Sequence, residues 1–172
     1  MKNLLVTISA LIFVGCGNPK LDNQLRIAAR NGNIEDVKKL LDAGANINAQ
    51  GEDKYIFDGT PLNNASEFGH DEIVKLLISK GADLNANNIG YTPLYATIYS
   101  PRGNGPHKTI VEILIESGAN INAKTKNGFT SLDAALLVER QKNLNNTISR
   151  ILQSKGATSG AKSSLLVAAT LG

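Results

Sequence analysis

Few residues in this chain have the types and spacing that chemistry needs, and the two histidines are the first to consider. His70 and His107 are separated by 37 positions, and no Cys, His or carboxylate cluster with metal-ligand spacing accompanies His70. The glycines lie at the ends of repeated segments, so none forms a loop that could cradle a phosphate. The sequence therefore predicts a structural role for His70, no catalytic residues, no metal site and no cofactor.

The single cysteine, Cys16, follows an apolar segment near the N-terminus. Lys2 precedes residues 4–14, which are too few to span a bilayer as a helix but suit a secretory signal. The sequence Phe13-Val14-Gly15-Cys16 resembles the end of a bacterial lipoprotein signal peptide, in which the Cys is acylated and becomes the N-terminus. The resemblance implies a signal peptide over 1–15, a lipid anchor on Cys16, a tether over 16–20 and a place in the bacterial cell envelope. An ordinary signal peptide with an incidental Cys is the alternative.

A ten-residue segment recurs along the chain and sets its organisation. Its glycine is Gly44, Gly81, Gly118 and, in a shortened fourth copy, Gly156, at steps of 37, 37 and 38 residues. A constant period of this size indicates stacked structural repeats. Each glycine ends an apolar, helix-like segment, where glycine readily adopts the left-handed conformation that closes a helix.

A second motif precedes each of these segments and would begin a helix. Thr60-Pro61-Leu62 and Thr92-Pro93-Leu94 place Thr at an N-cap and Pro at the first helical position, and Thr130-Ser131-Leu132 is a weaker copy. Together the two motifs resemble the ankyrin-repeat family, whose repeat has Thr-Pro-Leu, a Gly between two short helices, and Leu-Leu-x-x-Gly-Ala. The resemblance implies an all-α solenoid of about four helix-turn-helix repeats plus a C-terminal half-repeat, with hairpin loops between the repeats.

The expected ankyrin-repeat domain covers 21–172, with repeats at about 21–50, 58–87, 90–124 and 128–157. In the first repeat we expect a helix over 23–30 and a second helix capped by Asn33, with the greater polarity of an end repeat. The half-repeat would be 163–172, because Ser163-Ser164-Leu165 stands where Thr-Pro-Leu would stand. Leu166 aligns with residues that we expect to be exposed, which predicts weak self-association through an apolar patch. Those aligned residues are Arg26, Asn63, Tyr95 and Asp133.

Three loops depart from the regular repeat. Residues 50–59 include Tyr55, Ile56 and Phe57, which either pack locally or form a contact patch. Residues 100–108 contain two Pro and two Gly, which predict a protruding loop, whereas good helix formers after Leu137 predict a longer first helix in the fourth repeat. We expect the additions in the third and fourth repeats to lie on one face.

Composition excludes some functions and leaves a binding role. A net charge of +3 and the absence of Trp give no sign of nucleic-acid binding. The family resemblance implies a protein partner of unknown identity, bound by hairpin tips and first helices, so the chain would be a membrane-tethered adaptor or scaffold. A structural envelope lipoprotein and an inhibitor or immunity-type protein that blocks an enzyme remain as alternatives. The expected partner-binding residues are Asn63, Asn64, Glu67, Asn88, Ile89, Tyr91, Tyr95, Lys126, Asn127 and Phe129.

Overall fold

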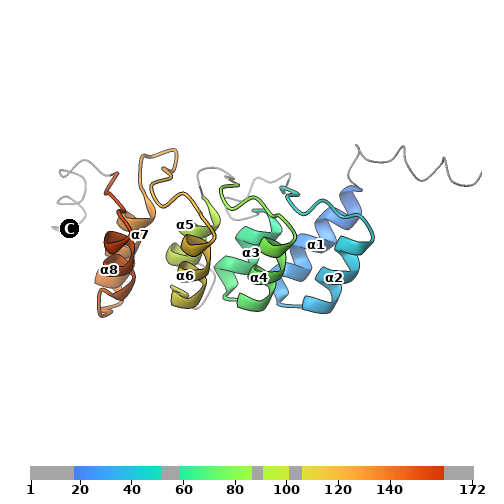
Figure 1. Ribbon diagram of the computed structural model, residues 1–172, viewed down its shortest axis with the longest axis horizontal. Coiled ribbons are helices and arrows are strands. Elements are labelled where there is room, and N and C mark those ends of the chain that lie inside the picture. Colours follow the sequence, from blue (N-terminus) through green and yellow to red (C-terminus); the bar gives the residue numbers. More distant parts are fainter. Residues whose placement is uncertain (1–17, 52–58, 87–90, 101–105, 161–172) are drawn as a thin grey trace, which may run out of the picture.

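The computed structural model describes residues 18–51, 59–86, 91–100 and 106–160, and within them eight α-helices form four pairs that stand in a row (Figure 1). The predicted all-α solenoid is confirmed. The first helices of the pairs are α1 (Pro19–Asn31), α3 (Pro61–Phe68), α5 (Pro93–Tyr99) and α7 (Ser131–Gln141). The second helices are α2 (Ile34–Asp42), α4 (Asp71–Ser79), α6 (Lys108–Glu116) and α8 (Thr147–Ser154).

Helices α3 and α5 begin with the predicted Thr-Pro caps, and α7 begins at Ser131 after the predicted Thr130. The hydroxyl of Thr60 accepts a hydrogen bond from the Asn63 N–H at 3.2 Å, and Pro61 opens α3. Helix α1 begins at Pro19, earlier than the predicted residue 23, because Asn18 supplies the same kind of cap to the Lys20 N–H at 3.1 Å. Pro19 and Lys20 therefore belong to the helix and not to the predicted 16–20 tether.

The second helices end as the recurring glycines predict. Gly44, Gly81, Gly118 and Gly156 all have left-handed backbone, with φ between +85° and +95°. After Gly81 the chain folds back so that the Ala82 N–H donates to the Leu77 carbonyl at 3.0 Å. The turn satisfies a carbonyl at the end of α4 and sends the chain into the next hairpin.

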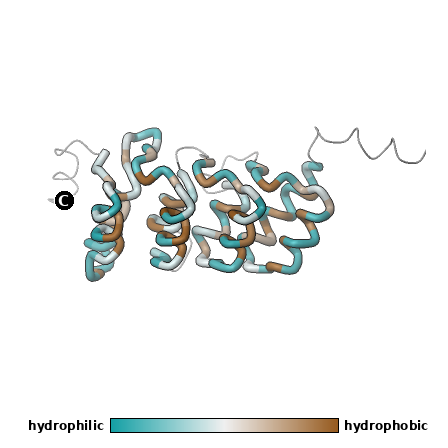
Figure 2. Tube along the Cα trace, in the orientation of Figure 1, coloured by the Kyte–Doolittle hydropathy of each residue, from teal (hydrophilic) through white to brown (hydrophobic). Residues whose placement is uncertain are grey.

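The core is a set of equivalent positions repeated along the stack. Each first helix buries one leucine against its neighbours, and each second helix buries one to three larger aliphatic residues. Hydrophobic and hydrophilic segments alternate along the helices in Figure 2, as expected where one helix face is buried. The buried leucines of the first helices are Leu25, Leu62, Leu94 and Leu132.

Helix α7 confirms the longer first helix predicted for the fourth repeat, with 11 residues against 8 in α3. None of the described helices has the length and the apolar character that crossing a bilayer requires. Several predictions concern residues outside the described ranges, so they stay predictions. These are the signal peptide with Cys16, the aromatic residues 55–57, the hairpin residues Asn88 and Ile89, most of the 100–108 loop, and the half-repeat 163–172.

Candidate interaction surface

The four first-helix residues expected to face a partner are buried. The exposed fractions of Asn63, Asn64, Glu67 and Tyr95 are 5%, 2%, 3% and 8%. The expectation that their side chains lie open to a partner is therefore corrected. They lie where successive first helices stack, and a buried polar side chain must satisfy its hydrogen bonds inside the protein.

Asn63 and Asn64 use their amides to join neighbouring repeats. The side-chain amide of Asn63 donates to the Tyr91 carbonyl of the next repeat at 2.8 Å. The amide of Asn64 donates to the Arg26 carbonyl of the preceding repeat at 3.2 Å. The two side chains point to opposite neighbours, so together they fix the spacing of the first three repeats.

Asp133 occupies the Asn63 position in the fourth repeat and serves the same purpose. Its carboxylate accepts hydrogen bonds from the Thr130 N–H at 2.8 Å, the Gly160 N–H at 2.9 Å and the Ser159 hydroxyl. Burial alone would raise the pKa of Asp133, but these hydrogen bonds outweigh it and hold the pKa below its ordinary value of 3.8. The carboxylate thus ties the chain beyond α8 to α7.

The position shared by Asn63 and Asp133 is buried in all four repeats. Arg26 and Tyr95 complete the set, and each is less than 9% exposed. The exposure expected of these four residues is therefore wrong, because the position lies between stacked first helices. The expected self-association through Leu166, which was inferred from their exposure, loses its basis.

The histidines link α4 and α6 to the preceding repeat. His70 Nε2 lies 2.9 Å from the Arg30 carbonyl, and His107 Nε2 lies 3.2 Å from the Glu67 carbonyl. A Cβ on Gly69, with φ +81°, would lie 2.5 Å from the His107 ring, so the ring requires glycine there. Burial lowers the pKa of His107, although the hydrogen bond to Glu67 opposes this shift. The structural role predicted for His70 agrees with this geometry.

A family model of three ankyrin repeats matches residues 25–125, which is more than half of the 172-residue chain. The chain belongs to the ankyrin-repeat family. Ankyrin repeats are protein–protein interaction modules, so the fold gives this protein a binding role. No curated protein matches the chain.

The hairpin edge of the ankyrin stack is tied by a hydrogen-bond ladder that the sequence analysis missed. Asn48 Oδ1 accepts from the Asp83 N–H at 2.8 Å, and Asn85 Oδ1 accepts from the Asn120 N–H at 2.7 Å. Asn122 Oδ1 continues the ladder by accepting from the Thr158 N–H at 2.8 Å. The recurrence of Asn at the same position of each repeated segment was the available signal.

Glu139 is a second residue that the sequence analysis missed. Its Oε1 accepts hydrogen bonds from the backbone N–H groups of Ile148 at 2.7 Å and Ser149 at 3.1 Å. It therefore caps α8 from the last turns of α7, while no histidine joins α8 to the preceding repeat among the residues described. The prediction of a longer first helix was correct, but it did not indicate that the extra turn positions a cap.

Three tyrosines form a cluster on the third repeat of the ankyrin stack. The rings of Tyr91 and Tyr95 meet edge to face with centroids 4.9 Å apart, and Tyr99 lies 5.7 Å from Tyr95. Tyr95 is buried, whereas Tyr91 and Tyr99 are only half-buried. Burial raises the pKa of Tyr91 and, more strongly, that of Tyr95, so both hydroxyls stay protonated at neutral pH. Tyr99 was not among the predicted site residues.

The next hairpin presents the remaining predicted residues. The Gly128 N–H donates to the Thr125 carbonyl at 2.9 Å, and the Thr125 N–H donates to the Phe129 carbonyl at 2.8 Å. Lys126 and Asn127 are exposed at the tip, and Phe129 is half-buried against the core. The structure thus keeps Lys126 and Asn127 accessible as expected, while Phe129 is partly used in packing.

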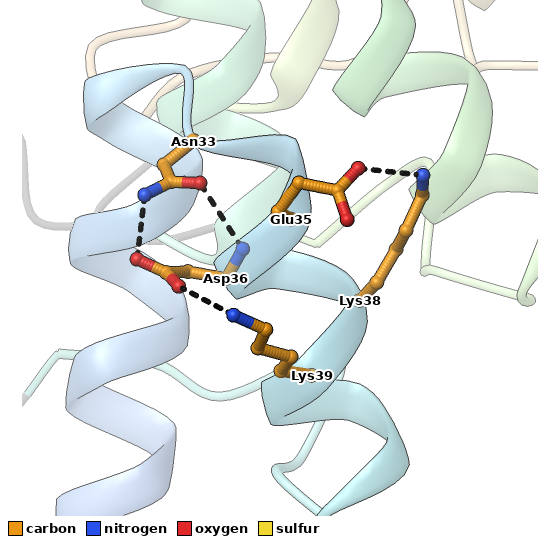
Figure 3. Close-up of polar contacts among 5 residues, drawn as sticks. All are labelled: Asn33, Glu35, Asp36, Lys38 and Lys39. Atoms are coloured by element: carbon orange, nitrogen blue, oxygen red, sulfur yellow. Dashed lines mark hydrogen bonds and ion pairs between the residues drawn. The ribbon is translucent and has the colours of Figure 1, made fainter.

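The N-terminal end of the stack carries an open groove of about 450 Å³ between α1 and α2. Figure 3 shows its polar side, where Asn33 caps α2 by accepting a hydrogen bond from the Asp36 N–H. The Asp36 carboxylate lies 4.0 Å from Lys39 Nζ. The second repeat places Ile73 and Leu76 at the Asp36 and Lys39 positions. The greater polarity expected of the end repeat is therefore present, and it keeps this face compatible with water.

The described residues contain no group of three or more His, Cys, Asp or Glu side chains that could hold a metal ion.

Proposed function

We propose that this ankyrin stack binds a protein partner through a surface named here the tip surface. It comprises the tip of the third hairpin (residues 125–129) and the exposed part of the tyrosine cluster of the third repeat. The tip surface consists of Tyr91, Tyr99, Lys126, Asn127 and Phe129. The observation that carries the proposal is the combination of half-buried aromatic rings with exposed polar residues on adjoining segments.

This composition is typical of a binding surface. Aromatic side chains held by packing lose little conformational entropy on binding, and Tyr is enriched among the residues that dominate binding energy. The edge-to-face contact of Tyr91 with the buried Tyr95 holds the Tyr91 ring in place before a partner arrives. Lys126 forms no ion pair within the described residues, so its ammonium group is available to pair with a carboxylate of the partner.

The proposal moves the site away from part of the predicted set. Asn63, Asn64, Glu67 and Tyr95 act in stacking, and their burial excludes direct contact with a partner in this conformation. The surface that remains lies on the hairpins and at the C-terminal end of α5, where it adds the half-buried Tyr99.

The partner would meet this surface at a membrane of the bacterial cell envelope. The support comes from the sequence, in which the apolar segment 4–14 leads directly to Cys16. Only residues 17 and 18 would then separate the acylated Cys16 from Pro19, the first residue of α1. At about 3.5 Å a residue this spacing holds the N-terminal repeat close to the lipid headgroups and leaves the third hairpin farther along the stack.

Capture of the partner tests the tip surface. The tagged full-length chain is recovered from crosslinked membranes, the captured protein is identified and purified, and its affinity is measured by calorimetry. Lys126→Glu combined with Phe129→Ala should weaken binding at least about tenfold, because both an anchor ring and a charge are lost. The matched control is Lys38→Glu, on the outer face of α2, which should bind like the parent. Equal affinity of the parent and the double variant would exclude the tip surface.

The anchor is tested separately by mass spectrometry of the mature N-terminus. The proposal predicts an acylated Cys16 and more than one acyl chain, because a single chain holds a membrane only marginally. Cys16→Ser should release the protein from the membrane fraction. Cleavage at another residue, or a free Cys16 thiol in a soluble mature protein, would contradict the anchor but leave the tip surface untouched.

A further inference from the structure

Asn127 differs from the other asparagines on the hairpin edge. Asn48, Asn85 and Asn122 each accept a backbone hydrogen bond from the following repeat, so their amides are held in the ladder. The Asn127 side chain is exposed and forms no hydrogen bond with any described residue. It is also followed by a glycine, whereas each of these ladder asparagines is followed by alanine.

The local backbone places Asn127 in a tight turn. The hydrogen bond from the Gly128 N–H to the Thr125 carbonyl closes a four-residue turn with Asn127 in its third position. Asn127 does not have a positive φ, which is typical of a type I turn, and Gly128 follows with φ +84°. A few local hydrogen bonds at an exposed tip hold this turn, so its opening requires little free energy.

We propose that Asn127 is a site of spontaneous deamidation by its own backbone. When the turn opens, the Gly128 nitrogen loses its proton and attacks Cγ of Asn127. The bond from Cγ to the side-chain nitrogen breaks, and that nitrogen leaves as ammonia with the proton. Water then opens the resulting five-membered imide at either carbonyl and gives Asp or isoaspartate. Glycine favours the attack because it has no side chain to crowd the approach.

The chain contains a second described Asn-Gly pair that serves as an internal comparison. Asn31 is also exposed, but it is the last residue of α1, and the Gly32 N–H donates to the Ala28 carbonyl. The His70 ring lies against Gly32, where an added Cβ would be 2.6 Å from it. Freeing the Gly32 nitrogen therefore requires unpacking of the junction between the first two repeats, so Asn31 should be protected.

The reaction would change the tip surface. A carboxylate would appear beside Lys126 and Phe129, and the isoaspartate product would also add one backbone atom to the turn. The chemistry itself does not depend on the proposed function. Its consequence for a partner rests on that proposal, because only then does the hairpin meet a binding protein.

The test compares the two asparagines in the same molecule. The full-length protein is incubated at mildly alkaline pH, folded or in urea, then digested and analysed by mass spectrometry with separation of Asp and isoaspartate. In the folded protein position 127 should convert at least about tenfold faster than position 31, as a gap of about 1.4 kcal/mol between their local opening free energies would produce. In urea the two rates should become similar.

Asn127→Gln is the matched control, because its longer side chain closes the ring far less readily. It should abolish conversion at 127 and leave the slow rate at 31 unchanged. An intact Asn127 in the folded protein, or equal folded-state rates at 31 and 127, would overturn the proposal. Neither result would bear on partner binding, which the affinity of the Lys126→Glu and Phe129→Ala double variant tests independently.

Discussion

The first helices and the third hairpin carry similar polar residues, but those of the first helices are buried and those of the hairpin tip are exposed. Asn63 and Asp133 are buried, and each bridges to the chain segment that follows its own repeat. Lys126 and Asn127 are exposed and have no described partner for their side chains. In a stack of repeats, the face of a first helix that meets the next repeat is an interior surface, so polarity there indicates hydrogen bonding between repeats.

This difference divides the roles within the molecule. The first helices and the histidine contacts set the geometry of the stack, whereas Lys126 and Asn127 at the hairpin tip can be replaced at little cost in stability. Binding residues on loops held by a rigid scaffold are a common arrangement.

The largest effect should come from placing a side chain beneath an inter-repeat contact. Gly69→Ala should lower the free energy of unfolding by about 3 kcal/mol, because it strains a left-handed residue and displaces His107 from the Glu67 carbonyl. Urea denaturation followed by circular dichroism measures this.

Gly81→Ala is the matched control, since Gly81 has a similar φ of +86° but nothing within 4 Å of an added Cβ. At Gly81 the substitution adds only the backbone strain of a left-handed alanine, so the expected loss of unfolding free energy is about 1 kcal/mol. Equal losses for the two variants would show that the histidine contact contributes nothing to the stack.

A smaller effect is expected at the buried acid of the fourth repeat. Asp133→Ala should cost about 2 kcal/mol in unfolding free energy, because it leaves the Thr130 and Gly160 N–H groups without their acceptor. Asn127→Ala should change stability by less than about 0.5 kcal/mol, as is usual for an exposed residue without partners. Equal unfolding free energies for Asp133→Ala and Asn127→Ala would contradict the assigned difference between the buried and the exposed polar residue.

The smallest effects should appear on acidification, at two separate stages. The lowered pKa of His107 means that the unfolded chain takes up the proton first, so stability should fall as the pH drops through about 6.5 and level off below the folded pKa. The lowered pKa of Asp133 gives a contribution that is complete above 3.8 and lost as the pH falls through the folded pKa.

Thermal unfolding over a pH series, compared between the parent and two variants, separates these stages. His107→Gln should remove the part of the decline in melting temperature that occurs near pH 6.5. Asp133→Asn should remove only part of the decline in melting temperature below pH 3.8. A pH dependence identical in the parent and His107→Gln would contradict the assigned burial of that ring.

The sequence predicted the elements well because the signals for them are local. The Thr60-Pro61 start and the closing glycines act within a few residues, so spacing alone placed them. The start of α1 was missed because Asn18-Pro19 caps as Thr-Pro does but lies outside the repeat period.

The candidate site was predicted less well because burial depends on partners distant in sequence. The amide of Asn63 contacts residue 91, and Asp133 contacts residues 159 and 160, which periodicity does not reveal. Glu139 caps a helix nine residues away only because α7 is extended to present it. Lys126 and Asn127 are exposed as expected because they lie at a hairpin tip, and their role in binding stays a prediction.

Thiol labelling of the folded protein tests the contrast between the first helices and the hairpin tip most directly. Cys16→Ser removes the only cysteine, after which Asn63→Cys or Asn127→Cys introduces a single thiol. The account predicts that the thiol at 127 reacts as fast as in urea, whereas the thiol at 63 reacts only when the stack opens or unfolds. Fast labelling at 63 in a protein that remains folded by circular dichroism would contradict the account, because the first-helix position would then be open to a partner.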